Sequence, residues 1–137
     1  MLTEEQKRTW QEKGYLIVRG LFSPAEVAYY REHFMDLNAQ GAEASRTVAE
    51  PKPGDPLLKH PRMIPTHRWD QTSLDWMRDK RIRDTMVDLV GKEPYAVQTM
   101  FYFKPAGARG QALHQDNYYL RVQPGTCVAA WMAVDRC

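Results

Sequence analysis

Apolar and polar positions along the first forty residues alternate between helical and extended patterns. Thr3 followed by Gln6 forms a capping-box pattern, which predicts a short polar helix that ends near Gly14. The apolar run 15–18 lies between two glycines and predicts a short buried strand. The run Ser23-Pro24-Ala25-Glu26 is a second helix start, and apolar residues follow it at helical spacing: Val27, Tyr30, Phe34 and Leu37.

The pattern changes twice more along the rest of the chain. Residues 40–66 lose periodicity and contain five prolines, as a long functional or irregular loop does. Residues 73–90 carry an apolar stripe at helical spacing, and Gly91 is placed to end that helix. Segments 95–103, 117–122 and 127–134 are rich in aromatic and β-branched residues, and turn signals separate them, so they predict strands.

Composition narrows the class of protein. The net charge is +2 over 137 residues, and basic and acidic residues are interspersed, so neither a nucleic-acid footprint nor a membrane-surface patch is expected. A small-molecule substrate follows as the expectation. The chain shows no signal peptide and no apolar run of membrane-spanning length, and its two cysteines favour reduced thiols in the cytoplasm.

The run Leu113-His114-Gln115-Asp116 offers candidate metal ligands. Side chains two apart on an extended backbone point to the same side, so His114 and Asp116 can approach one ion together. A second histidine from elsewhere would complete a two-histidine, one-carboxylate triad, which leaves positions open on iron(II). For an arbitrary H-x-D triplet, a surface pair or a hydrogen-bonded strand end is the more common interpretation, and the context of the motif is what favours a metal site.

The preceding segment has two unlike faces. Gln98, Met100, Tyr102 and Lys104 fall on one side of an extended chain, and Val97, Thr99, Phe101 and Phe103 on the other. A ligand cavity would have such a polar face, and so would a solvated edge strand. Trp131 lies between the small residues Ala129 and Ala133 on one face, which suits either a ligand platform or ordinary core packing.

Other candidates remain open. His67-Arg68 could hold an acidic group of a substrate or form a solvated loop end, and His33 is interpreted as a surface residue. Gly107 and Gly110 around Arg109 could bring backbone close to an anion or simply form a turn.

The run from Lys104 to Tyr119, together with Pro124-Gly125-Thr126 and Ala130-Trp131, closely resembles the phytanoyl-CoA dioxygenase family. The resemblance extends to Gly14-Tyr15, Phe22-Ser23 and His67-Arg68-Trp69. It implies iron(II) binding by His114 and Asp116, and 2-oxoglutarate contacts from Met100 and Trp131. Gln98, on the same face as Met100, is added to that pocket.

The resemblance also implies a fold and a reaction. The fold would be α+β with a mainly β core: a double-stranded β-helix, which is a jelly-roll or cupin-like barrel, with N-terminal helices. Residues 1–137 would form one domain, mostly helical over 1–92, with the first barrel strands over 93–137. The enzyme would couple decarboxylation of 2-oxoglutarate to oxidation of a small-molecule substrate by O2, with ascorbate as a candidate reductant.

The family pattern further requires a later histidine and an arginine for the far carboxylate of 2-oxoglutarate, and no histidine follows His114. We therefore expect an incomplete barrel in a truncated domain, with self-association through its open edge. His67 as a surrogate ligand, a short protein that binds metal or ligand without catalysis, and a zinc hydrolase or other cupin-like metal protein are the alternatives.

Overall fold

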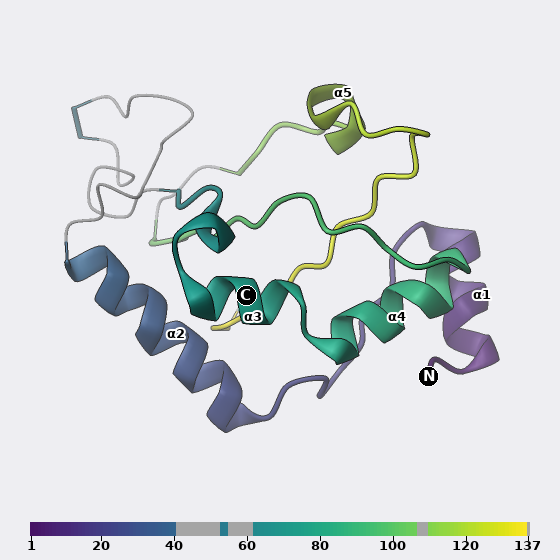
Figure 1. Cartoon of the computed structure of the whole chain (residues 1–137), viewed down its shortest axis with the longest axis horizontal. Helices are drawn as coiled ribbons and strands as arrows, with labels where there is room; N and C mark the ends of the chain where they lie inside the picture. The colour runs from purple at the N-terminus through teal and green to yellow at the C-terminus, as the bar shows by residue number, and fades with distance from the viewer. Residues whose placement is uncertain (41–52, 55–61, 107–109, 137) are drawn as a thin grey trace.

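The computed structural model describes residues 1–40, 53–54, 62–106 and 110–136. Figure 1 shows residues 93–106 running back past α4 and α3, and residues 110–136 forming a long excursion that carries α5. The helices, in chain order, are α1 (Glu4–Lys13), α2 (Pro24–Ala39), the 3-10 helix η2 (Thr66–Arg68), α3 (Gln71–Met77), α4 (Lys80–Val90) and α5 (Asp116–Leu120).

Both predicted helix starts are confirmed. The Thr3 hydroxyl accepts a hydrogen bond from the Gln6 amide, and the Gln6 side chain accepts one from Thr3, so α1 begins with a complete capping box. Ser23 and Glu26 make the same reciprocal pair at the start of α2. Gly14 ends α1 in the left-handed conformation, with φ of 73°, which a residue without a Cβ adopts at low cost.

The helical region predicted over 73–90 is two helices. Asp70 caps α3 by accepting the Ser73 amide, and Asp79 caps α4 by accepting the Arg81 amide. A cap at Asp79 requires non-helical backbone there, so the apolar stripe is interrupted between Met77 and Lys80. Gly91 ends α4 as predicted.

The prediction of a mainly β, jelly-roll or cupin-like core is wrong for the described residues. They contain no β-strand, and their only β-type pairing is an isolated antiparallel bridge between Met63 and Phe101. Segments 15–18, 95–103 and 127–134 are not strands, and most of 117–122 lies in α5. Aromatic and β-branched residues favour extended backbone, but a strand also needs a neighbour that takes up its hydrogen bonds. Among the described residues, these segments have such a neighbour only at Phe101.

Alternating burial along residues 99–103 nevertheless follows the predicted faces. Thr99 and Phe103 are buried and Phe101 is half-buried, whereas Met100 is exposed. Phe34 of α2 stacks on Phe101 with ring centroids 3.9 Å apart. The aromatic core, as we name it, consists of Phe34, Met63 and Phe103, with Leu37 and Phe101 packed against it.

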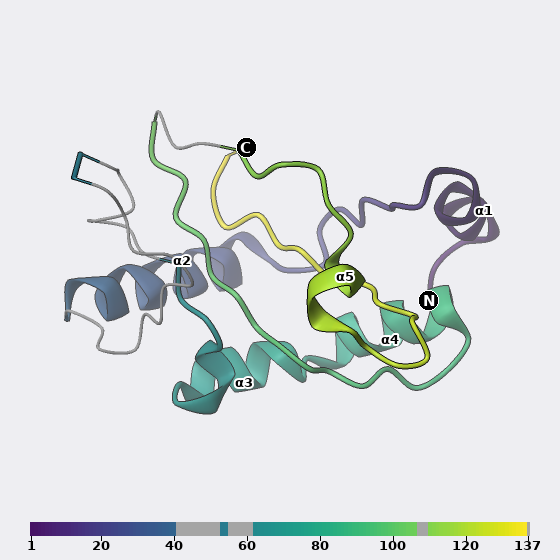
Figure 2. The ribbon, with the colours of Figure 1, turned by 90° about the horizontal axis from the view of Figure 1, so that it is seen from above.

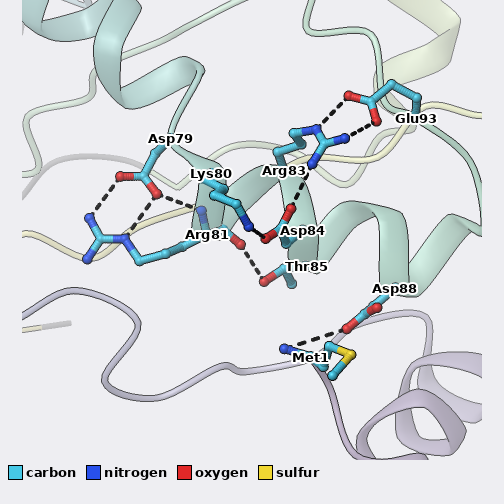
Figure 3. A network of polar contacts seen from close by, with 9 residues as sticks. All are labelled: Met1, Asp79, Lys80, Arg81, Arg83, Asp84, Thr85, Asp88 and Glu93. Atoms are coloured by element: carbon cyan, nitrogen blue, oxygen red, sulfur yellow. Dashed lines mark hydrogen bonds and ion pairs between the residues drawn. The ribbon is translucent and has the colours of Figure 1, made fainter.

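Arg81 joins the start of α4 to the start of α2. Its guanidinium donates to the carboxylates of Glu26 (2.7 Å) and Asp79 (2.8 Å) and to the Leu21 carbonyl, and it lies over the Phe22 ring. The hydrogen bond from Arg81, followed by those from Ser23, lowers the pKa of Glu26 to about 2. The same guanidinium lowers the pKa of Asp79. Figure 3 shows Arg81 with further ion pairs of this surface, Arg83 with Glu93 and Met1 with Asp88.

The second half of the described chain leaves many large apolar side chains in solvent. In Figure 2, seen from above, the excursion that carries α5 lies apart from α2. Among the described helices, none is long and apolar enough to cross a membrane. The exposed apolar residues include Tyr95, Leu113, Tyr118, Tyr119 and Trp131.

Removing the Phe34 ring tests the aromatic core. Phe34→Ala should lower the free energy of unfolding by about 3–5 kcal/mol, because it removes a buried ring and leaves Phe101 without its stacking partner. Urea denaturation followed by circular dichroism measures this change. Met35→Ala, on the exposed side of the same helix, should change it by less than about 0.5 kcal/mol. Equal losses in the two variants would contradict this core.

Acid should weaken the Arg81 cluster. Glu26 and Asp79 have pKa values below their usual ones in the folded chain, so the unfolded chain binds more protons as the pH falls below about 4.5. Their stabilisation is therefore present at neutral pH and is lost between about 4.5 and 2. In thermal unfolding, the melting temperature of Arg81→Gln should be well below that of the parent at pH 7 and close to it near pH 2. Arg31→Gln, which removes an exposed charge on α2, is the control, and its melting temperature should stay close to that of the parent at every pH.

Candidate metal and ligand site

His114 and Asp116 meet at the start of α5. The His114 Nε2 atom lies 3.1 Å from Asp116 Oδ1. Gln115 between them has φ of −109° and ψ of 124°, which is extended backbone, and it places the two side chains on the same side. The two side chains are 27% and 41% exposed, so solvent can reach both donor atoms. The structure thus brings this predicted pair together.

A backbone contact orients the imidazole. His114 Nδ1 lies 2.7 Å from the Ala112 carbonyl oxygen, and since a carbonyl only accepts, Nδ1 carries the hydrogen. In the neutral ring the Nε2 lone pair then faces the Asp116 carboxylate. A histidine that binds a metal through one nitrogen commonly donates its other N–H in this way.

The spacing of the two donor atoms suits a shared ion. Two ligands at right angles, with bonds of about 2.1 Å, lie about 3.0 Å apart, close to the observed 3.1 Å. Without an ion, a protonated His114 would pair with Asp116 at the same distance. Within the described ranges, no group of three or more His, Cys, Asp or Glu side chains is arranged to hold a metal. Among the described residues, the metal donors at the start of α5 are therefore His114 and Asp116.

A pocket of 460 Å³ adjoins the pair. Sequence reasoning missed four of its lining residues: Gln115, Asn117, Gly125 and Cys127. Adjacency to Asp116 is the signal that could have indicated Asn117, and the predicted Gln123-Pro124-Gly125 turn could have indicated Gly125. The described lining residues are His114, Gln115, Asp116, Asn117, Gly125 and Cys127.

Predicted 2-oxoglutarate contacts fall around a second pocket. Trp131, 73% exposed, lines a pocket of 370 Å³ with Tyr102, Lys104, Gly110 and Gln111. The Tyr102 hydroxyl donates to the Met100 sulfur at 3.1 Å, so Met100 lies beside this pocket. Gln98 is half-buried and is not among the described residues that line either pocket. His114 and Trp131 thus line different pockets.

Positive charge lies next to the second pocket. Lys104 is one of its lining residues, and the Arg62 guanidinium lies over the Tyr102 ring, 5.4 Å from its centroid. The Arg62 Nε atom is buried without a hydrogen-bond partner. Sequence reasoning did not single out Arg62, because it stands in the aperiodic stretch between α2 and η2.

His67 is held by Thr99 instead of forming a solvated loop end. The Thr99 hydroxyl accepts the His67 backbone amide at 3.0 Å and lies 2.8 Å from His67 Nδ1 and 2.9 Å from the Thr66 hydroxyl. Burial, and secondarily Arg68, lowers the pKa of His67. Arg68 is exposed in η2. A role of these two residues toward substrate stays a prediction.

His33 is not simply a surface residue, because its Nε2 lies 2.8 Å from the Asp70 carboxylate, where it supports the cap of α3. Arg109 and Gly107, the candidates for an anion-binding turn, lie outside the described residues.

Comparison with known proteins bears on the identity of the chain. The family model described as Phytanoyl-CoA dioxygenase (PhyH) matches residues 10–137. This chain belongs to the phytanoyl-CoA dioxygenase family. It is 23% identical to Phytanoyl-CoA dioxygenase 1 of Oryza sativa subsp. japonica and to Phytanoyl-CoA dioxygenase of Arabidopsis thaliana, in each case over 98% of this chain and 59% of the relative.

A third relative extends the same similarity. The chain is 23% identical to Probable phytanoyl-CoA dioxygenase of Caenorhabditis elegans, over 99% of this chain and 48% of that protein. The chain therefore spans about half the length of the curated relatives that it matches. No solved structure matches it. The family's relatives carry dioxygenase names, so the family is one of oxidoreductases.

The lowered pKa of His67 can be measured directly. We expect its imidazole to titrate below 6.5 in NMR spectra, because burial and the Arg68 charge both disfavour the charged ring. Protonation then favours the unfolded chain, so this residue's contribution to stability falls as the pH drops below 6.5. Arg68→Gln should raise the titration midpoint of His67 in part, because it removes the Arg68 charge but leaves the larger effect of burial. A midpoint at or above 6.5 in the parent would show that His67 is not held as described.

Proposed function

We propose that this chain carries the metal and cosubstrate site of an iron(II)- and 2-oxoglutarate-dependent dioxygenase that hydroxylates a small molecule. The observation that supports it most directly is the 3.1 Å approach of His114 Nε2 to Asp116 Oδ1 beside a pocket. Family membership makes oxygenase chemistry the natural use of this pair.

Each residue of the pair has a definite part. Neutral His114 offers the Nε2 lone pair, and the Ala112 carbonyl keeps the ring in that tautomer. Ionised Asp116 offers an anionic oxygen, which offsets part of the charge of a divalent cation. Because both ligands must be deprotonated, metal binding by this pair weakens as the pH falls.

The second pocket suits a dicarboxylate. Lys104 and Arg62 supply positive charge, and the exposed face of Trp131 supplies an apolar platform for the carbon chain. We assign 2-oxoglutarate contacts to Met100 and Trp131 and, through its place on the same segment, to Gln98. Arginine and lysine side chains bind carboxylates strongly where water is partly excluded.

Bound iron(II) and 2-oxoglutarate would supply the oxidising chemistry with O2, with decarboxylation of 2-oxoglutarate to succinate. The chain's own residues bind, orient and shield. The substrate segment is proposed to include His67 and Arg68. His67 is hydrogen-bonded to Thr99, the residue next to Met100.

A second function is favoured by the number of donors. Since the described residues group only two metal donors, the chain can also act as a metal- or ligand-binding module without catalysis. The two functions differ in one respect that can be measured. Only the oxygenase requires iron(II) and 2-oxoglutarate to bind together.

An anaerobic titration separates the two. Iron(II) followed by 2-oxoglutarate should produce the visible absorption band of the metal-bound keto acid in the parent chain. His114→Ala should abolish it, because losing a direct ligand costs more affinity than the about 10–100-fold attributed to outer partners of a metal site. His33→Asn, which removes an imidazole remote from α5 in sequence, is the matched control and should keep the band.

Each result decides between the functions. Iron binding that depends on His114 but gives no band with 2-oxoglutarate would favour the metal-binding module. A band that persists in His114→Ala would refute the assignment of this pair.

A further inference from the structure

Asn117 makes two bonds that fold the chain back beside the metal pair. Its carboxamide Oδ1 accepts the Val122 amide at 2.9 Å, and its backbone carbonyl accepts the Arg121 amide at 2.9 Å. Arg121 has φ of 51°, a left-handed conformation that non-glycine residues adopt only where surrounding contacts hold it. The reversal after α5 is therefore held largely by Asn117.

The bond to Val122 also fixes the orientation of the carboxamide. Only the oxygen can accept the Val122 amide, so the flip of the group is determined. The Nδ2 end lies over Gly125, where an added Cβ would be 3.8 Å from it. Asn117 and Gly125 both line the pocket that contains His114 and Asp116. Within the described part of the chain, Nδ2 has no hydrogen-bond acceptor, so two N–H donors are available there.

We propose that Asn117 is a positioning residue of this site. Its oxygen holds the turn 121–125 against the pocket, and its amide nitrogen donates to a carboxylate oxygen of a ligand bound beside the His114–Asp116 pair. The inference deepens the proposed function and rests on it. The carboxylate meant is the one at the metal-binding end of 2-oxoglutarate, and the carboxylate at its far end is the one proposed to face Lys104 and Arg62. A neutral donor suits this place, because Asp116 next to it would repel the carboxylate that the metal attracts.

Two substitutions separate the roles of the oxygen and the nitrogen. Asn117→Asp keeps an acceptor for the Val122 amide but replaces the two N–H donors with a negative oxygen. Asn117→Ala removes both. Gln115→Glu adds the same charge to the neighbouring lining residue and is the matched control for a general electrostatic effect. Circular dichroism establishes that each variant is folded.

Three readouts follow each variant. Calorimetry measures the binding of Mn²⁺ and then of 2-oxoglutarate to the Mn²⁺-loaded chain, and hydrogen exchange measures the protection of the Val122 amide. Asn117→Ala should bind Mn²⁺ about 10-fold more weakly and exchange the Val122 amide faster. Asn117→Asp should keep that amide protected and bind Mn²⁺ at least as tightly as the parent, yet bind 2-oxoglutarate about 10-fold or more weakly. Gln115→Glu should weaken 2-oxoglutarate binding less than Asn117→Asp does.

Unchanged 2-oxoglutarate binding in Asn117→Asp, or an equal loss in Gln115→Glu, would overturn the proposal. A His114→Ala arm keeps its failure distinct from that of the proposed function. If Mn²⁺ binding is lost in His114→Ala while the Asn117 variants behave like the parent, only the role of Asn117 falls. If Mn²⁺ binding is absent from the parent or survives in His114→Ala, the proposed metal pair falls, and this inference with it.

Discussion

The crossing of residues 62–67 over residues 99–103 is the constraint on which the rest of the described structure depends. Met63 and Phe101 exchange both backbone hydrogen bonds at 3.0 Å, and Thr99 ties His67 and Thr66 to the same segment. Phe34 stacks on Phe101 and joins α2 to this crossing. Backbone pairing and ring packing meet at this one place. The segment before α3 and the segment after α4 are therefore held together there.

This crossing also sets where ligand chemistry can occur. The side of residues 99–103 that faces inward forms the aromatic core, so Met100, Tyr102 and Lys104 are left on the open side. Tyr102 and Lys104 line a pocket with Trp131, and Arg62, next to the bridging Met63, packs on Tyr102. The same pairing that buries one face therefore assembles the charged and aromatic side chains of the other.

Sequence reasoning succeeded where the determining contacts are local. The capping boxes at Thr3 and Ser23 need only residues three apart, and both formed. Alternation at residues 99–103 likewise reflects backbone geometry alone. The strands failed because a ladder needs partners distant in sequence, and for segments 95–103 and 127–134 the described residues supply only the Met63–Phe101 bridge. The contact between His67 and Thr99 could not be foreseen either, since 32 residues separate them.

The candidate metal site shows the same distinction between local and distant contacts. The Ala112 carbonyl, the extended Gln115 and the Asn117 turn lie within a few residues of His114 and Asp116, so the pair can be oriented without a barrel around it. A third ligand and a carboxylate anchor are contacts of long range, which depend on chain topology. Metal capture can therefore be encoded by one short segment, whereas catalysis requires the assembly of segments that are far apart in sequence. This explains why the pair was predictable from a triplet and its neighbours, while the relation between the two pockets was not.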